Sequence, residues 1–354
     1  MTSLRNHILG QLHGRGTALF QFQRYLPNDE IPQIKVVPIA RGHGGKTAAM
    51  MSVPCMLGEQ LPSGLSLGAK NPLAMAKAVQ EHKQANARLQ HEGYRQTLES
   101  RTVEFPLKSS GEIQCELQLR DIVGQILSHT TEDSAEPQLH RYHEYVRQAA
   151  LSDVLWVIQS PPHVDTRENL ARFRDDLLIT QSYLEEALRQ RENPQQCTVV
   201  FVIGKVDSLF ETPQQAIQQL DPERMLLMFE PLTAVVQASR VVASSAIFPL
   251  SSFGFGNAML DPRSEQDSKE RADRAEKNTA RSREEEEAEW ILKPGRVFEP
   301  FNLIPLLVYT IKEGIGNYHP PLFSSRKKKL EQVLKQLRSD FPRLRPWYVP
   351  VKGS

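Results

Sequence analysis

The sequence has few cysteines, almost no net charge and no long apolar run. Its three cysteines, Cys55, Cys115 and Cys197, are isolated and odd in number, which argues against a disulfide framework or a zinc site. The 354 residues carry a formal net charge of +1, which favours neither a nucleic-acid partner nor an acidic substrate. The longest late apolar run, residues 303–311, is too short to cross a bilayer, and the first residues lack the apolar core of a signal peptide. We therefore expect a soluble, cytoplasmic protein.

A glycine-rich loop is the most informative feature that the sequence does contain. It follows an apolar run at residues 34–40 and consists of Arg41, Gly42, His43, Gly44, Gly45, Lys46 and Thr47. Glycines in such a loop let backbone N–H groups turn towards phosphates, with Lys46 placed to neutralise β and γ oxygens and Thr47 to ligate Mg²⁺. Ala40 stands where a phosphate loop usually has its first glycine. A glycine-rich turn without any ligand is the alternative.

Six strands are predicted, and they are of two types. Four near-continuous apolar runs are typical of parallel strands covered on both faces, and they lie at residues 34–40, 154–158, 198–203 and 241–246. Two alternating runs predict a half-exposed antiparallel pair with a turn at residues 108–111, and they lie at residues 103–107 and 113–120.

Helical patterns separate the later strands, at residues 166–191, 213–220 and 222–238. Strands that alternate with helices predict an α/β fold, a doubly wound, mostly parallel six-stranded sheet with one antiparallel hairpin at its edge. Ligands of such sheets bind beyond the carboxyl ends of the parallel strands. The residues that follow each strand are therefore the candidates for chemistry.

Asp121, Gly124 and Gln125 follow the run at residues 113–120. An acidic side chain at a strand end can hold Mg²⁺ through water, and a glycine three residues later can offer its N–H to a γ-phosphate. Gln125 is then placed to orient an attacking water molecule. An ordinary acidic turn is the alternative.

Lys205 and Asp207 follow the run at residues 198–203. A carboxylate there can accept hydrogen bonds from both N1–H and the exocyclic amine of guanine, which adenine does not offer in the same places. The aliphatic part of Lys205 can cover the base. Ser245 and Ala246, at the end of the next run, are expected to offer backbone N–H groups to the guanine carbonyl.

With these four signals in this order, residues 34–250 resemble a P-loop GTPase of the translation-factor and Ras-like class, and most of all the bacterial double-GTPase type domains. The motifs that carry the resemblance are ARGHGGKT, DIVGQ, GKVD and SSA. It implies a G-domain fold, binding of GTP or GDP with Mg²⁺, slow GTP hydrolysis, and a nucleotide-dependent switch that acts on an effector or regulatory protein. Gly204 departs from the family because an Asn or Thr usually precedes the base-reading lysine. A pseudo-GTPase scaffold without turnover and a P-loop ATPase are the alternatives.

The resemblance also implies a threonine that completes the Mg²⁺ shell, for which Thr97 is the candidate and Thr102 the alternative. Arg95 lies close enough in sequence to act as an arginine finger, although a solvated surface arginine is the plainer interpretation. Pro54 should shorten or kink the helix after the phosphate loop. Residues 57–100 are expected to form a mobile lid over the nucleotide.

Composition divides the chain into five parts. They are an N-terminal extension (residues 1–33), the GTPase core (34–250), a charged insertion (251–300), the closing helix of the core (301–316) and a basic C-terminal tail (317–354). The insertion holds eleven acidic and seven basic residues at 261–289, which predicts a flexible segment or a solvated helix. The tail has an apolar stripe, Leu330, Val333, Leu334 and Leu337, and is expected to dock on the core. Contact of its basic residues with a membrane or with nucleic acid is the alternative.

Overall fold

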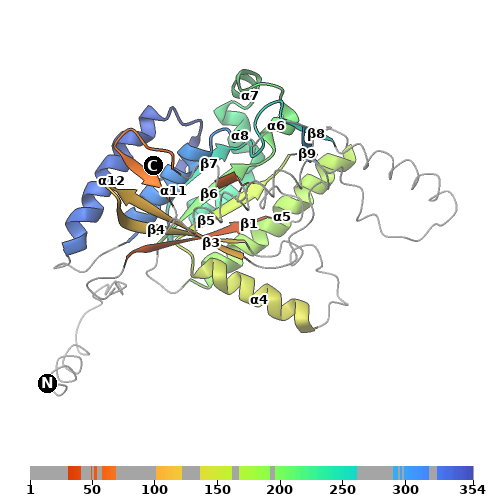
Figure 1. The fold of residues 1–354 in the computed structure, drawn as a ribbon. Coiled ribbons are helices and arrows are strands. Elements are labelled where there is room, and N and C mark those ends of the chain that lie inside the picture. The colour runs from red at the N-terminus through yellow and green to blue at the C-terminus, as the bar shows by residue number, and fades with distance from the viewer. Residues whose placement is uncertain are drawn as a thin grey trace, which may run out of the picture.

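The protein is an α/β structure built on one mixed sheet of eight strands in the order β10-β7-β6-β5-β1-β4-β3-β2 (Figure 1). The computed structural model describes residues 31–40, 49, 52–53, 58–68, 101–121, 136–161, 167–191, 196–260, 290–293, 296, 299–318 and 325–353. The strands of this sheet are β1 (Gln33–Ile39), β2 (Leu65–Leu67), β3 (Arg101–Ser109), β4 (Glu112–Asp121), β5 (Val154–Gln159), β6 (Cys197–Ile203), β7 (Val242–Pro249) and β10 (Val349–Lys352). Neighbouring strands from β7 to β4 are all parallel.

Helices cover both faces of the sheet. Those with bounds in the described part are α4 (Glu136–Ala150), α5 (Arg167–Arg189), α6 (Val206–Leu209), α7 (Pro213–Gln219), α8 (Pro222–Met228), α9 (Glu230–Ala238), α11 (Leu303–Gly316) and α12 (Ser325–Arg343). Figure 1 shows α11 and α12 on one side of the sheet and α4 and α5 on the other. No helix in these ranges is long and apolar enough to cross a membrane.

The continuous apolar character of the central strands is explained by these two covered faces. In β1, Val36 packs into the core beneath α11 and α12, whereas Val37 packs into the core beneath α4 and α5. Because successive side chains of a strand point to opposite faces, both must be apolar when both faces are buried. The four predicted parallel strands and the predicted antiparallel pair are confirmed.

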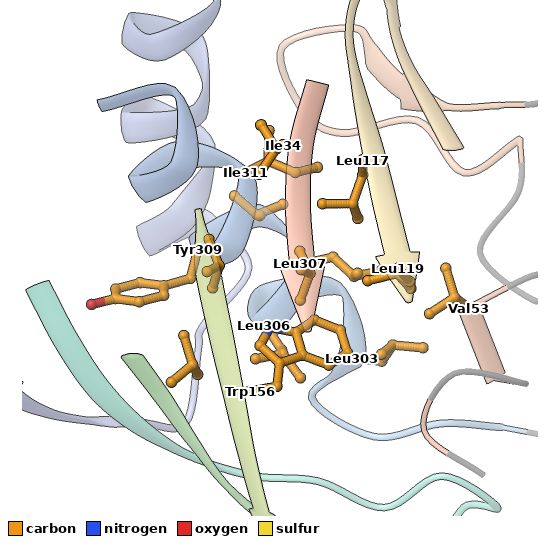
Figure 2. Packing of buried hydrophobic residues seen from close by; sticks show 14 of the residues in the cluster. Ile34, Val53, Leu117, Leu119, Trp156, Leu303, Leu306, Leu307, Tyr309 and Ile311 are labelled. Atoms are coloured by element: carbon orange, nitrogen blue, oxygen red, sulfur yellow. The ribbon is translucent and has the colours of Figure 1, made fainter. Parts of the chain in front are cut away.

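The core beneath α11 is centred on Trp156 of β5, which is fully buried and lies against the leucines of α11 in Figure 2. The indole Nε1–H of Trp156 donates to Thr310 Oγ1 at 2.9 Å. A buried indole N–H needs such a partner, because leaving it unpaired would cost about 1–3 kcal/mol. The hydrogen bond therefore fixes α11 in one position over the sheet.

The prediction of six strands is wrong, because β2 and β10 add one strand at each edge. β2 pairs with β3, so the β3–β4 hairpin is not at the edge, and β10 pairs antiparallel with β7. β4 lies between β1 and β3, and its polar residues Glu116 and Gln118 are 5% and 6% exposed. The expected half-exposed face of β4 is therefore wrong as well. These polar groups stay paired, as Gln118 Nε2 donates to Glu104 Oε1 at 3.0 Å.

The hairpin turn is shorter than predicted. Ser110 and Gly111 both have positive φ, 49° and 83°, and Ser109 pairs directly with Glu112. Two central residues with positive φ form the two-residue turn whose twist matches that of the flanking strands. Gly111 fits this conformation without strain.

The expected docking of the basic tail on the core is confirmed. Leu330, Val333, Leu337 and Phe341 of α12 are buried in the same core as Trp156, and Leu334 packs against it. A polar clamp then joins this tail to the end of β7. The Asn302 side chain donates to Pro249 O at 2.8 Å and to Trp347 O at 2.6 Å, and it accepts from Trp347 N at 3.3 Å.

A separate two-stranded ribbon lies within the predicted insertion (residues 251–300) and borders its most charged part, residues 261–289. β8 (Ala258–Leu260) and β9 (Trp290–Leu292) pair antiparallel, with Leu260 opposite Trp290. Residues 261–289, which connect these strands, lie outside the described residues, as do residues 1–30. The ribbon therefore fixes both ends of this connection at one place.

Candidate functional site

The candidate site lies at the edge of the sheet where the parallel strands end. β1 ends at Ile39, β5 at Gln159, β6 at Ile203 and β7 at Pro249. Ile39 is aligned with Val157, while Gln159 is aligned with Ile203, and Ile203 with Pro249. The segments that follow these strands therefore leave the sheet from one edge, which is where α/β sheets bind ligands.

The phosphate loop itself lies outside the described residues. This applies to Arg41, Gly42, His43, Gly44, Gly45, Lys46 and Thr47, so their predicted roles stay predictions. On either side of the loop, Ala40 is fully buried and Ala49 and Ser52 have helical backbone. Ala40 is not among the described non-glycine residues that have positive φ. An alanine therefore suits the backbone at the position where the common motif has its first glycine.

Asp121 is the last residue of β4, whereas the sequence prediction ended this strand at Arg120 and placed Asp121 directly after it. β4 is the neighbour of β1, with Leu119 opposite Val36, so Asp121 ends the strand beside the one that leads into residues 41–47. Gly124 and Gln125, like the side chain of Asp121, lie outside the described part. The structure thus supports the position of Asp121 at this edge and leaves its chemistry a prediction.

Of the two threonines considered for the Mg²⁺ shell, only Thr102 is described. Thr102 is exposed and lies near the start of β3, opposite Arg120. Since Arg101 is paired with Asp121, this start of β3 lies at the same sheet edge as the carboxyl end of β4. Thr97 and Arg95 lie outside the described residues, and so does the predicted lid (residues 57–100) except for residues 58–68. The prediction of a lid is wrong for Leu65–Leu67, which form β2 of the sheet. Thr102 is therefore within the site region, and Thr97 stays a prediction.

The loop after β6 is fixed by its backbone. Gly204 N donates to Gln159 O at 2.8 Å, and Val206 N donates to Leu250 O at 3.2 Å. Lys205 has left-handed backbone angles, φ 55° and ψ 35°, which cost a residue with a Cβ about 1–2 kcal/mol. Strained residues of this kind persist where the surrounding structure holds them, and they concentrate at functional sites. The loop is thus tied by its backbone to the ends of β5 and β7.

Asp207, in the first turn of α6, has the most unusual environment of the predicted side chains. The residue as a whole is half-buried, but its Oδ2 is shielded from solvent and has no hydrogen-bond partner among the described residues. Burial raises the pKa of Asp207 from 3.8 to about 6, against the opposing effects of hydrogen-bonding groups, including those of Ser251 and Phe253, and of the charge on Lys205. A shielded acceptor without a donor is costly, so a ligand that supplies donors would be favoured here.

The predicted role of Ser245 and Ala246 as residues of a strand end is wrong. β7 continues to Pro249, and both residues are fully buried inside the strand, where Ser245 is opposite Val199. Side chains and backbone at that depth cannot reach a ligand at the sheet edge. The sequence prediction ended the strand too early, at the small residues Ser244, Ser245 and Ala246, whereas the apolar residues that follow them continue it.

Residues 250–254 occupy the place that was assigned to Ser245 and Ala246. Ser251 Oγ accepts from Gly254 N at 2.8 Å, and Phe301 N donates to Ser251 O at 2.9 Å. Gly254 has φ +95°, and an added Cβ would lie 2.5 Å from Glu299 O, so only glycine fits. The loop is therefore rigid, and it adjoins Asp207 through the bond between Val206 and Leu250. Its only sequence signal is the Ser-Ser pair, Ser251 and Ser252, after the apolar end of β7.

Within the described part of the chain, the histidine side chain that the structure places is that of His143. His143 is exposed on α4, and its ring lies against that of Tyr142 at 5.7 Å between centroids. Within the described ranges, no group of three or more His, Cys, Asp or Glu side chains could hold a metal ion. The edge of the sheet is therefore the candidate site that remains.

Comparison of the chain with models of known protein families gives no match. Comparison with curated protein sequences gives no match either.

Proposed function

We propose that the chain binds GTP with Mg²⁺ at the carboxyl edge of its sheet, hydrolyses it slowly, and acts as a nucleotide-dependent switch for a partner protein. The order β7-β6-β5-β1-β4-β3 of the central strands supports assignment to the P-loop NTPases of the G-domain type. It brings the carboxyl ends of β1, β4, β6 and β7 to one edge, and the segments expected to recognise phosphate, metal and base follow these strand ends.

The residues at this edge fit such a ligand. Lys46 and the backbone of the phosphate loop would hold the phosphates, while Thr47 and Asp121, with Thr97 or Thr102, would hold Mg²⁺. The metal would neutralise charge between the β- and γ-phosphate oxygens. Gln125 would orient the attacking water, and the Gly124 N–H would respond to the γ-phosphate. Catalysis would then consist of positioning and electrostatic stabilisation.

The observation that carries the proposal is the shielded, unpartnered Oδ2 of Asp207. Guanine offers two adjacent donors, N1–H and the exocyclic amine, which match the two oxygens of a carboxylate. Adenine offers an acceptor at N1 and would leave Oδ2 of Asp207 unpaired. A site that is built to accept hydrogen bonds rejects an analogue without the donors by several kcal/mol. Asp207 therefore favours a guanine nucleotide over ATP.

The fixed backbone around Asp207 weakens the objection that Gly204 raises. The side chain that is missing at Gly204 normally ties the base-reading loop to the phosphate loop. Here the bonds from Gly204 to Gln159 and from Val206 to Leu250 fix the same loop through its backbone. Residues 250–254 then supply the wall beside the base in place of Ser245 and Ala246. Neither Ala40 nor Gly204 is a reason to assign the chain to the scaffold alternative.

The test is a comparison of nucleotides across three variants. Binding of GTP, ATP and xanthosine triphosphate with Mg²⁺ is measured by calorimetry for the wild type, Lys46→Ala, Asp207→Asn and the control Asp175→Asn, an exposed carboxylate on α5. Xanthine has a carbonyl where guanine has its amine, so it suits an amide better than a carboxylate. We expect Lys46→Ala to bind none of the nucleotides. Asp207→Asn should bind xanthosine triphosphate in preference to GTP. Asp175→Asn should behave as the wild type.

Turnover of bound GTP separates the alternatives. Phosphate release that needs Mg²⁺ would support the switch, and tight binding without release would support the scaffold. Preference for ATP in the wild type would contradict the role given to Asp207. Failure to bind any of the three nucleotides would refute the proposal as a whole.

A further inference from the structure

The outer face of α12 is strongly basic. Its buried side, formed by Leu330, Val333, Leu337 and Phe341, lies in the core. Its exposed basic residues are Lys328, Lys329, Lys335, Arg338 and Arg343, and Arg345 follows the helix. Glu331 is the exposed acidic residue of the helix, since Asp340 is fully buried. The near-zero net charge of the chain thus conceals one surface on which basic side chains greatly outnumber acidic ones.

The basic residues extend around the helix. Residues of an α-helix are turned by about 100° from one to the next. Lys328 and Lys335 consequently lie on the crest, opposite the buried stripe, with Arg338 on one flank and Lys329 and Arg343 on the other. Lys329 also pairs with Glu112 at 3.1 Å, but both side chains are exposed and such a pair is weak. The charge therefore covers the crest and both flanks of the helix.

This distribution does not suit a membrane or a protein partner. The apolar stripe that would insert into a bilayer is already buried in the core, and none of the large apolar side chains that are exposed in the described part belongs to α12. A flat anionic surface would reach only the crest, and a protein interface would need apolar or aromatic anchors. Single-stranded nucleic acid is bound on exposed aromatic rings. Trp347 and Tyr348, which follow the helix, are instead packed against other rings.

Charges on both flanks suit the major groove of B-form DNA. An α-helix with its side chains is about 10–12 Å wide and this groove is about 12 Å wide, with a row of phosphates along each wall. Crest and flank cations then reach both rows at once. The major groove of an RNA duplex is too narrow for such a helix. In Figure 1, α12 lies at the outer side of the molecule, next to α11.

We propose that the basic face of α12 binds double-stranded DNA through its phosphates, without reading the sequence. Five contacts of this kind predict a slope of log K against log salt of about −4.5. This proposal does not depend on the nucleotide site, since α12 carries none of the residues assigned to it.

The test is binding of the full chain to a fluorescent DNA duplex of about 20 base pairs, which exceeds the roughly 8 base pairs that the 19-residue α12 spans. Anisotropy is measured between roughly 50 and 200 mM salt. The variant Lys328→Glu/Lys335→Glu/Arg338→Glu is compared with a control of equal charge change, Arg167→Glu/Arg174→Glu/Arg240→Glu, whose arginines are exposed elsewhere. We expect the α12 variant to bind at least about tenfold more weakly and its salt slope to fall by about 3. The control should bind as the wild type does.

Other outcomes overturn the proposal. Equal losses in both variants would show an effect of total charge, and no loss in the α12 variant would show that α12 is not the contact. Equal binding of single-stranded DNA or of an RNA duplex would contradict the groove geometry. Binding of phosphatidylserine vesicles without binding of the duplex would assign the surface to membranes. Circular dichroism checks folding, and the milder Lys328→Gln/Lys335→Gln/Arg338→Gln variant replaces the charge reversal if the latter unfolds.

Discussion

Replacement of Asp207, whose Oδ2 is shielded and has no hydrogen-bond partner among the described residues, should stabilise the protein in the absence of nucleotide. Burial raises the pKa of Asp207 from 3.8 to about 6. Each unit by which the pKa in the folded state differs from that in the unfolded state corresponds to about 1.4 kcal/mol of stability. The full difference would be about 3 kcal/mol at pH 7. Because the residue is only half-buried as a whole, we expect Asp207→Asn to gain about 1–3 kcal/mol in the free energy of unfolding.

The stability that Asp207→Asn gains over the wild type should increase as pH rises. In the folded state Asp207 holds a proton to higher pH than in the unfolded state, so its ionisation costs stability as pH rises from about 4 to about 6. Urea unfolding at several pH values between about 4 and 8 should show wild type and Asp207→Asn converging near pH 4 and differing most above pH 6. The exposed carboxylate variant Asp175→Asn should follow the wild type throughout.

Saturating GTP should reverse the order, because guanine donors would pair with the carboxylate and stabilise only the wild type. A difference in stability that does not change with pH would refute the assigned environment of Asp207. A variant that is less stable than the wild type at pH 7 without nucleotide would refute it equally.

Two further predictions concern the structures that hold the site. Gly254→Ala should destabilise the protein by at least about 2 kcal/mol in thermal unfolding, because φ at this position is +95° and the added Cβ would lie 2.5 Å from Glu299 O. The control Gly58→Ala, at φ +89° but with open space around it, should lose less stability. Equal losses of stability in the two variants would contradict the close approach at Gly254. Phe341→Ala should lower the free energy of unfolding in urea by about 3–5 kcal/mol, because Phe341 packs against Tyr309 and Tyr348. The control Leu227→Ala, at a residue that is 68% exposed, should change it by less than about 0.5 kcal/mol. A small effect of Phe341→Ala would mean that α12 is not part of the core.

The central sheet was predictable because its physical signal is local. A run such as residues 199–203 is apolar at every position because helices cover both faces of the sheet, and that pattern is visible in the local sequence alone. The hairpin was equally visible from alternation around a turn. β2 and β10 were not, because three or four residues are too few to show a period, and Pro350 opposes the assignment of a strand.

The site was predictable only as far as it depends on strand ends. The positions of Asp121 and Asp207 follow from β4 and β6, but the end of β7 depends on partners that are distant in sequence. Ser244 is tolerated inside β7 because its Oγ pairs with Thr198 Oγ1 at 2.8 Å, a contact that only the folded sheet supplies. The environment of Asp207 likewise depends on Ser251 and Phe253, more than forty residues away. Such contacts cannot be deduced from a local pattern.

The ribbon of β8 and β9 has a practical consequence for protein engineering. Because Leu260 and Trp290 are directly paired, the two ends of the connection between them are held together, and lengthening that connection lengthens a loop whose ends are already joined. Doubling the length of such a loop costs only about 0.6 kcal/mol. A fluorescent reporter whose termini lie close together can therefore be inserted between residues 261 and 289 with the eight-stranded sheet left intact. This would give a fusion that monitors the protein in living cells while both ends of the chain stay unmodified.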